Sequence, residues 1–359
     1  MALLVGGLAL AAGLMPTMAS AADGRLLLEP TELQARGGTV MVGLEAPPNR
    51  CTLTLRPALG QPLTREITCG GGVRSRVALP ANHSPTAMRY VISLRPRGWG
   101  SAIERRVTVP AALRVELFAD SLGHQAAPYF AAVLRATGDT RVKLETFPGS
   151  SICGYLGEMR LDAAQFHPKA VVLQFSGDRF LNCAQRGAST RSSMYDQALA
   201  AVRILSKGGA TRIYLVGTST IECPLPHAPA GECPPAFYRQ VNQAYDQLVR
   251  VTDRGPQRRL LRRISPGSAL LTPSGQHFTD HLACLVHEPC LGTPYGRRTN
   301  WVRQVDGIHF CRPQWPKGSF PPQGCPSYSS GAYRYGASMA SSVIADFGLG
   351  RVPDLHSTR

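Results

Sequence analysis

Short alternations of apolar and polar residues dominate residues 23–110. Seven runs have the two-residue period of strands that bury one face, and turn-forming Gly, Pro and Asn residues separate them. About seven short strands at this spacing predict a β-sandwich over residues 22–110, with Pro110 marking its end. The predicted strands are Leu26–Glu29, Thr39–Leu44, Cys51–Arg56, Thr64–Cys69, Val73–Leu79, Tyr90–Leu94 and Ile103–Val109.

From residue 113 the pattern changes to near-continuous apolar runs that alternate with helical periodicity. Such an alternation predicts an α/β domain over residues 111–350, with a parallel sheet covered by helices on both faces. Residues 351–359 are then a C-terminal tail, and Arg312–Ser330 is a long Pro/Gly-rich loop. The predicted strands are Arg114–Ala119, Val142–Phe147, Ala170–Phe175 and Arg212–Val216, and the predicted helices are Gln125–Thr137, Ser193–Ser206, Ala236–Thr252 and Ala332–Phe347.

The first 21 residues carry no charge and end in the small-x-small pattern Ala19-Ser20-Ala21. This pattern predicts a signal peptide that is cut after Ala21. An uncleaved membrane anchor is the alternative, because about 20 apolar residues can span a bilayer. The sequence otherwise offers no apolar stretch of that length, so we expect a secreted or cell-envelope protein.

The ten cysteines agree with export, since their number is even and they form no Cys-x-x-Cys pair. Pairing of neighbours along the chain is one of the connectivities that the sequence allows. It gives the bridges Cys51–Cys69, Cys153–Cys183, Cys223–Cys233, Cys284–Cys290 and Cys311–Cys325.

The chain has 39 Lys and Arg against 23 Asp and Glu, a net charge of +16. In an exported protein, a basic surface of this kind suits an anionic envelope, an acidic polysaccharide or lipid headgroups. The alternative is that the charge serves solubility alone. The basic residues are scattered and no nucleic-acid-binding module is present, so we expect no nucleic-acid partner.

Polar residues follow the predicted parallel strands, at the edge where ligands bind in such sheets. Ser121 lies on a strand-to-helix turn, where a hydroxyl and a backbone N–H can face one ligand. Gly149 and Asp178 follow the next two strands. Taken singly, these residues are more typical of a helix N-cap, a turn glycine and an ordinary loop.

Near the C-terminus, Asp306 and His309 stand three residues apart in the sequence Val305-Asp306-Gly307-Ile308-His309. A carboxylate at this spacing can orient the imidazole, which can then deprotonate a serine. A surface pair or half of a metal site are the alternatives, but no third ligand lies nearby, so we expect no metal.

The remaining histidines and one tryptophan are weaker candidates for the site. His277 and His281 stand four residues apart and could line the crevice or bind a metal, although such a pair is more often structural. His124 belongs to the first helical turn, and Trp301 is either a substrate wall or a packing residue.

Taken together and in this order, the four blocks resemble those of the SGNH, or GDSL-like, hydrolase family. The blocks are Ala119-Asp120-Ser121-Leu122, Pro148-Gly149-Ser150, Ser176-Gly177-Asp178 and Asp306-Gly307-Ile308-His309. The resemblance covers about two-thirds of the chain and is closest to secreted actinobacterial members. It implies a flavodoxin-like three-layer α/β/α domain, and it supports the pair Cys153–Cys183.

The resemblance also implies roles for individual residues. Ser121 is the nucleophile, His309 the base and Asp306 the residue that orients it, and the N–H groups of Ser121 and Gly149 hold the oxyanion. The sequence departs from the family at Ala119, where the family has Gly, and at Asp178, where the family has Asn. An ionised Asp178 cannot donate to an oxyanion. The alternatives are that Asn182 donates in its place or that Asp178 is protonated.

We therefore expect a secreted serine esterase that acts on an ester, with O-acetylated carbohydrate, lipid and small esters as candidate substrates. Transfer of an acyl group to an envelope glycan by the same triad is one alternative. A non-catalytic glycan-binding protein with a degenerate hydrolase domain is the other. No cofactor is expected, the protein is expected to be a monomer, and the N-terminal region resembles an immunoglobulin-like accessory domain.

Overall fold

The computed structural model forms two compact units, each described here by itself. One contains residues up to 33, 38–79 and 88–108, and the other contains 34–37, 80–87 and the chain from Val109 on. The division after Thr108 lies beside the expected boundary at Pro110. The residues that the structure describes are 24–30, 33–58, 60–177, 183, 190–218, 235–255, 258–271, 279–304, 308–311, 322–350, 352 and 354.

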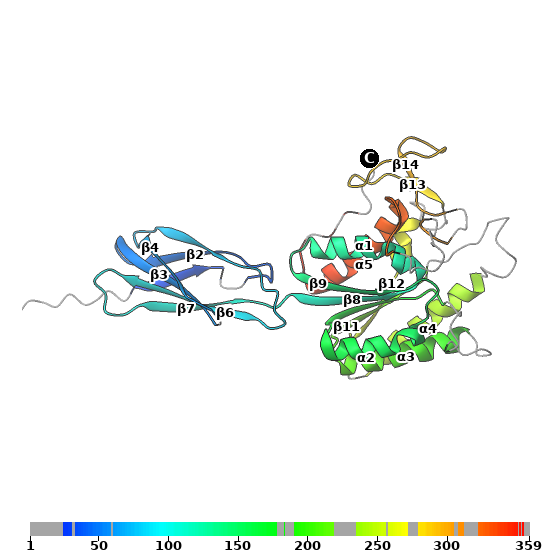
Figure 1. Cartoon of the computed structure of the whole chain (residues 1–359), viewed down its shortest axis with the longest axis horizontal. Helices are drawn as coiled ribbons and strands as arrows, with labels where there is room; N and C mark the ends of the chain where they lie inside the picture. The colour runs from blue at the N-terminus through cyan, green and yellow to red at the C-terminus, as the bar shows by residue number, and fades with distance from the viewer. Residues whose placement is uncertain are drawn as a thin grey trace, which may run out of the picture. The chain divides into compact units, whose positions relative to one another are not determined.

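The first unit is built from two antiparallel sheets (Figure 1). One sheet has the strand order β1-β2-β5 and the other has the order β4-β3-β6-β7. The seven strands match the seven predicted ones to within a few residues at each end. They are β1 (Arg25–Glu29), β2 (Gly38–Glu45), β3 (Asn49–Pro57), β4 (Leu63–Cys69), β5 (Arg74–Leu79), β6 (Met88–Pro96) and β7 (Ile103–Val109).

The apolar residues that alternate along these strands are mostly the ones whose side chains are buried. In β3, Cys51, Leu53 and Leu55 are buried, whereas the residues between them are partly exposed. The disulfide Cys51–Cys69 joins β3 to its neighbour β4. In the constant-type immunoglobulin order the fourth strand lies in the sheet of the fifth. Here it pairs with the third strand instead.

The second unit contains a parallel five-stranded sheet with the order β12-β11-β10-β8-β9. Counted from β8, this is the doubly wound order 2-1-3-4-5 of flavodoxin-like folds, as expected. A two-stranded antiparallel hairpin, β13–β14, lies outside it. The strands are β8 (Leu113–Ala119), β9 (Thr140–Thr146), β10 (Ala170–Gln174), β11 (Arg212–Val216), β12 (Leu261–Ile264), β13 (His281–Ala283) and β14 (Thr299–Trp301).

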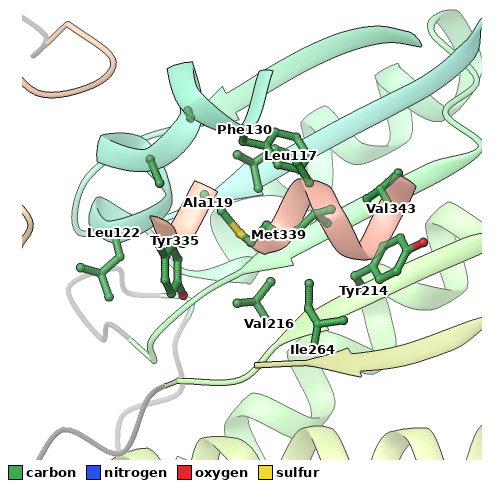
Figure 2. Close-up of a cluster of buried hydrophobic side chains, with 14 of the residues drawn as sticks. Leu117, Ala119, Leu122, Phe130, Tyr214, Val216, Ile264, Tyr335, Met339 and Val343 are labelled. Carbon is green, nitrogen blue, oxygen red and sulfur yellow. The ribbon is translucent and has the colours of Figure 1, made fainter. Parts of the chain in front are cut away.

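Helices cover both faces of this sheet and make a three-layer α/β/α domain (Figure 1). Helices α1 and α5 pack on one face, and α2, α3 and α4 pack on the other. Figure 2 shows the α1/α5 layer, where Met339 and Val343 of α5 lie over the sheet. The helices are α1 (Ser121–Arg135), α2 (Leu156–Gln165), α3 (Thr190–Lys207), α4 (Pro235–Asp253) and α5 (Ser330–Phe347), with short 3₁₀ turns at Ile152–Tyr155 and Pro266–Leu270.

Close backbone approach fixes how α1 and α5 pack. A side chain at Gly336 of α5 would come within 2.6 Å of the Ala126 carbonyl oxygen of α1. A side chain at Gly331 would come within 2.0 Å of the Val302 carbonyl oxygen. Glycine at both positions therefore lets α5 lie directly against α1 and against the segment that follows β14.

A buried carboxyl group interrupts the apolar interior strand β8. Glu116 has a fully buried side chain, and neither of its oxygens has a hydrogen-bond partner among the described residues. Lys143 lies 3.8 Å from it, but Lys143 also pairs with Asp162 and Glu145. Burial, followed by the neighbouring Asp162 carboxyl, raises the pKa of Glu116 to about 9.

The raised pKa makes the stability of this unit depend on pH. Between about pH 4.5 and 9 the folded chain keeps the Glu116 proton, whereas the unfolded chain releases it. The free energy of unfolding is therefore highest, as far as Glu116 is concerned, below about pH 4.5 and falls as the pH rises towards about 9. We expect Glu116→Gln, which mimics the protonated acid, to match wild type at about pH 5. At about pH 8.5 it should be more stable by about 1–3 kcal/mol in denaturant unfolding.

Glu158→Gln is the matched control, because Glu158 is an exposed carboxylate on α2. Its effect on the free energy of unfolding should change little between the two pH values. An effect of Glu116→Gln that is equally large at both pH values would contradict the assignment of a raised pKa.

Candidate active site

Ser121 is the first residue of α1 and directly follows the carboxyl end of β8. Asp120 caps the helix, because its carboxylate accepts a hydrogen bond from the Leu122 N–H at 3.1 Å. Ser121 itself is partly exposed. Its N–H has no acceptor among the residues that the structure describes, as the first N–H groups of a helix generally have none within the helix.

The tight fit of this turn depends on Gly123. A Cβ atom there would lie 2.2 Å from the Ala119 Cβ and 2.4 Å from the Gln174 Oε1. The Gly123 N–H donates to that same Gln174 oxygen at 2.6 Å. Helix α1 can therefore begin directly at the strand end only with glycine at this position.

His309 faces Ser121 across 188 residues of sequence. Its Nε2 lies 3.1 Å from the Ser121 Oγ, which is hydrogen-bond distance. When Nε2 carries no proton, the serine hydroxyl donates to it, and this is the arrangement that a base needs. Asp306, the predicted third member, lies outside the described residues.

The loop that carries His309 is held by its own backbone and by Arg303. The Gln304 N–H donates to the His309 carbonyl oxygen at 2.8 Å, and the Arg303 guanidinium donates to the Ile308 carbonyl oxygen. Arg303 is almost fully buried and lies 5.0 Å from the centroid of the Phe310 ring. A cation over an aromatic face in a water-poor environment fixes the turn beside His309.

Gln125 connects the two halves of the dyad, a role that the sequence did not reveal. Its side-chain Oε1 accepts from the Phe310 N–H at 2.8 Å, and its Nε2 donates to the Cys311 carbonyl oxygen at 3.0 Å. Gln125 stands one helical turn after Ser121, so both lie on the same side of α1. One helix face therefore presents Ser121 and clamps the backbone that follows His309.

Gly149 lies in the turn after β9, as expected. Its φ of +73° is a conformation that glycine adopts without strain. The turn is tied to the end of β8, because the Phe147 N–H and the Ser150 hydroxyl both donate to the Ala119 carbonyl oxygen, at 3.1 and 3.3 Å. No described residue accepts the Gly149 N–H. Asp178 and Asn182 lie outside the described residues.

Asp120 ties the third strand end to the nucleophile turn. Its carboxylate accepts from the Ser176 N–H after β10 as well as from the Leu122 N–H, and its own N–H donates to the Gln174 carbonyl oxygen at 3.0 Å. Burial raises the pKa of this carboxyl group, and the hydrogen bonds from Ser176 and Leu122 offset part of that rise. Asp120 thus positions the turn and is not itself open to a ligand.

Of the other candidate histidines, the structure describes His124 and His281, and neither contacts Ser121. His124 is buried, with Nδ1 3.0 Å from the Thr146 hydroxyl and Nε2 3.1 Å from the Pro322 carbonyl oxygen, and burial lowers its pKa. His281 stacks on Tyr295 in the β13–β14 hairpin, and His277 lies outside the described residues. In the part of the chain that the structure describes, no group of His, Cys, Asp and Glu could hold a metal ion.

Four of the five expected disulfides are present: Cys51–Cys69, Cys153–Cys183, Cys284–Cys290 and Cys311–Cys325. Cys153–Cys183 joins the segments that follow β9 and β10, and Cys284–Cys290 closes the loop after β13. Cys311–Cys325 begins two residues after His309. The fifth expected pair, Cys223–Cys233, lies outside the described residues.

Comparison with known proteins gives likenesses of fold only. No protein-family model and no curated protein matches the sequence. Among solved structures, the α/β hydrolase LAE5 from the metagenome of Lake Arreo is 13% identical, with 67% of this chain and 98% of that chain covered and a TM-score of 0.40. The lipase/acylhydrolase of Enterococcus faecalis is 16% identical over 46% and 87% of the two chains, with a TM-score of 0.32. The acetyl xylan esterase AlAXEase is 18% identical over 42% and 77%, with a TM-score of 0.31.

The position of Gln125 leads to a test of the clamp. Gln125→Leu should leave the Phe310 N–H and the Cys311 carbonyl group unpaired and let His309 drift from Ser121. We expect the rate of covalent labelling of Ser121 by a fluorophosphonate to fall by about tenfold or more. Gln125→Glu keeps the acceptor for Phe310 and should fall between Gln125→Leu and wild type.

Asn82→Ala is the control, since Asn82 is another buried amide that holds backbone carbonyl groups, those of Thr86, Val109 and Pro110. It should lower the melting temperature without slowing the labelling of folded protein. Equal labelling rates for Gln125→Leu and Asn82→Ala would rule out a positioning role for Gln125.

Proposed function

We propose that this chain is a serine esterase of the SGNH type, which hydrolyses an acyl ester through a covalent acyl-enzyme. The supporting observation is the 3.1 Å approach of His309 Nε2 to Ser121 Oγ at the carboxyl end of a doubly wound sheet. The order of the four sequence blocks adds to it, and the solved structures named above include esterases and acylhydrolases.

In the proposed reaction His309 takes the proton of the Ser121 hydroxyl while the serine oxygen attacks the ester carbonyl carbon. The N–H groups of Ser121 and Gly149 donate to the oxyanion that forms. The intermediate then expels the alcohol, which receives its proton from His309. Water activated by His309 releases the acid and restores the serine, while Asp306 keeps the imidazole oriented.

We propose export to an oxidising compartment, with residues 1–21 as the signal peptide. The four disulfides support this because such bonds form and persist in oxidising compartments. The net charge of +16 also supports it, because a basic protein suits an anionic envelope surface. None of the described helices combines the length and the apolar character that a bilayer crossing requires.

Transfer of the acyl group to a glycan uses the same nucleophile and base. It differs from hydrolysis only in that a sugar hydroxyl, in place of water, accepts the acyl group from Ser121. A non-catalytic glycan-binding role is the rival from another class. The Ser121–His309 hydrogen bond favours an enzyme over that rival, because a binding protein has no need of a base beside a serine hydroxyl.

Ser121→Ala tests the proposal directly. Wild type should hydrolyse p-nitrophenyl acetate, and the variant should retain about 10⁻³ or less of the rate, because the nucleophile is lost. Mass spectrometry should find a fluorophosphonate adduct on Ser121 in wild type only. Equal hydrolysis rates for the two proteins, or no adduct, would rule out the esterase. Products recovered on a glycan acceptor, in place of free acid, would indicate the transferase.

Asp178→Asn tests the third donor position of the oxyanion hole. An ionised Asp178 cannot donate a hydrogen bond and repels the oxyanion. If this position holds the third oxyanion donor, an Asn there should raise kcat by about 10²-fold, the usual effect of one such donor. Asn182→Ala should have little effect in that case. No gain in Asp178→Asn together with a loss in Asn182→Ala would assign the donor to Asn182.

A further inference from the structure

A rigid hairpin precedes the loop that carries His309. Strands β13 and β14 pair antiparallel, with His281 opposite Trp301. The disulfide Cys284–Cys290 closes the loop after β13, and the buried Asn300 donates to the Pro289 carbonyl oxygen and accepts from the Leu291 N–H. These contacts hold the hairpin in one conformation.

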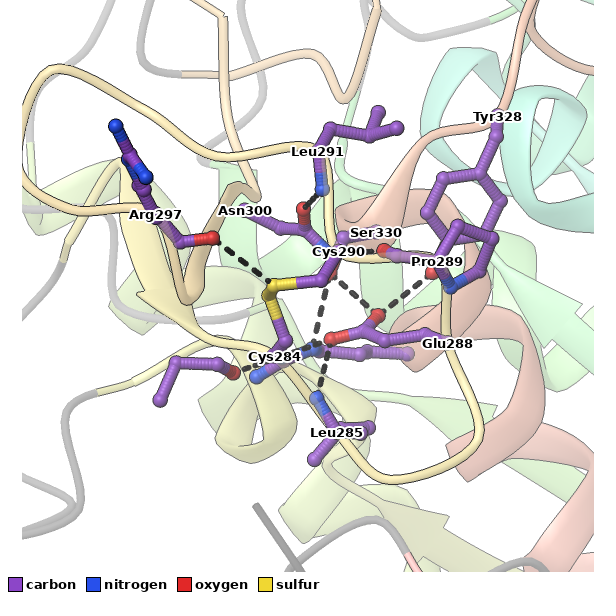
Figure 3. A network of polar contacts seen from close by, with 12 residues as sticks. Cys284, Leu285, Glu288, Pro289, Cys290, Leu291, Arg297, Asn300, Tyr328 and Ser330 are labelled. Atoms are coloured by element: carbon purple, nitrogen blue, oxygen red, sulfur yellow. Dashed lines mark hydrogen bonds and ion pairs between the residues drawn. A yellow bond between two sulfur atoms is a disulfide. The ribbon is translucent and has the colours of Figure 1, made fainter. Parts of the chain in front are cut away.

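A buried polar network anchors this hairpin to α5 (Figure 3). The Glu288 carboxylate accepts from the Tyr328 and Ser330 hydroxyls at 2.6 and 2.7 Å, and it pairs with the buried guanidinium of Arg334. Although burial alone would raise its pKa, these hydrogen bonds hold the pKa of Glu288 below its usual value. The hairpin is therefore fixed relative to the core and not free to fold over.

Three aromatic rings gather on this hairpin. His281 and Tyr295 stack with ring centroids 4.0 Å apart and planes within 9° of parallel. Trp301 meets both rings edge to face, at 6.4 Å from His281 and 5.9 Å from Tyr295. Tyr295 is nevertheless 62% exposed and Trp301 42% exposed. We name these three residues, His281, Tyr295 and Trp301, the aromatic platform.

Exposed large aromatic side chains are few in the described part of the chain. They are Phe147, Tyr295 and Trp301. Phe147 stands two residues before Gly149. Trp301 stands three residues before Gln304, whose N–H donates to His309, and three residues of chain span at most about 11 Å. Two of the three exposed rings thus lie together on the hairpin that leads into the His309 loop, and clustered exposed rings indicate a ligand surface more strongly than scattered ones.

We propose that the aromatic platform binds a sugar ring of the substrate, so that the ester is carried by a glycan. This inference rests on the proposed esterase function and narrows its substrate class. One face of a pyranose consists of C–H groups that pack on an aromatic ring, while its hydroxyls need polar partners at the rim. The Asp280 carboxylate, 2.6 Å from the His281 Nδ1, supplies such a partner beside the rings.

The same features argue against a lipid acyl chain as the occupant. A long acyl chain requires an enclosed apolar channel, because its whole circumference is apolar. The platform is instead open and is bordered by charged groups, namely Asp280 and the exposed Arg297 and Arg298. Such a surface suits a ligand with one apolar face and a polar edge.

Substrate comparison tests the proposal. The probes are p-nitrophenyl acetate and a panel of O-acetylated oligosaccharides of xylose, glucose and N-acetylglucosamine. Wild type should hydrolyse at least one oligosaccharide better than p-nitrophenyl acetate. Trp301→Ala and Tyr295→Ala should lower kcat/KM for that oligosaccharide about tenfold, mainly through KM, and change p-nitrophenyl acetate hydrolysis less than about twofold.

Two controls accompany these variants. Trp301→Phe keeps a ring and should retain most of the oligosaccharide activity, whereas Leu161→Ala removes an exposed apolar side chain of α2 and should change nothing. Equal losses on both substrates in Trp301→Ala would overturn the platform. So would a preference for p-nitrophenyl laurate that is lost in Trp301→Ala, because it would assign the rings to an acyl chain.

Binding separates failure of this inference from failure of the esterase proposal. In Ser121→Ala, calorimetry with the unacylated oligosaccharides of the same panel should detect binding that Trp301→Ala abolishes. Absence of hydrolysis and of a Ser121 adduct would overturn the esterase alone. Normal hydrolysis of p-nitrophenyl acetate, with no oligosaccharide bound or hydrolysed, would overturn the platform alone.

Discussion

The backbone hydrogen bonds that join the carboxyl ends of β8, β9 and β10 are the constraint on which the candidate site depends. The Ala119 carbonyl oxygen accepts from Phe147, and Asp120 exchanges bonds with the end of β10. The turns after β8 and β9 carry the candidate residues Ser121 and Gly149, so the joined strands set the distance between these two residues. These bonds are made by main-chain groups and by the buried Asp120 carboxylate, and none of them uses the N–H groups of Ser121 or Gly149.

Helix α1 extends this constraint to the far end of the sequence. Its first residue is Ser121, the proposed nucleophile, and Gln125, one turn later, clamps the backbone that follows His309. The close approach of Gly336 holds α5 against the same helix. The dyad therefore does not rely on a loop that closes independently, since the base is held by the element that presents the nucleophile. Preorganisation of this kind keeps reacting atoms within hydrogen-bond distance before a substrate arrives.

Much of this arrangement could be predicted from sequence, and the exceptions have physical reasons. The strands β8, β10 and β11 are mostly buried runs, so their apolar residues stand out, whereas the edge strand β9 is only partly buried and shows instead the alternation of Val142 and Leu144 with polar residues. The order of the chemical blocks indicated which strand ends to compare. The edge strand β12 carries Arg262 and Arg263 within four residues and gives no apolar signal. Helix α2 exposes Leu161 and buries Asp162, which breaks its periodicity. Gln125 belongs to no motif, because its partners are backbone atoms 185 residues or more away.

The buried pair of Glu288 and Arg334 supports the proposal that the hairpin takes part in the site. Taking two charges out of water is costly, and a buried ion pair is often no more stabilising than apolar residues of the same volume. What such a pair provides is one fixed geometry, here between the hairpin and α5, through a carboxylate that also takes hydrogen bonds from Tyr328, Ser330 and the Leu285 N–H. A segment that served only to cover the core could pack through apolar contacts. A segment that must present rings at a set distance from His309 requires directional bonds, and these are the contacts that the hairpin makes.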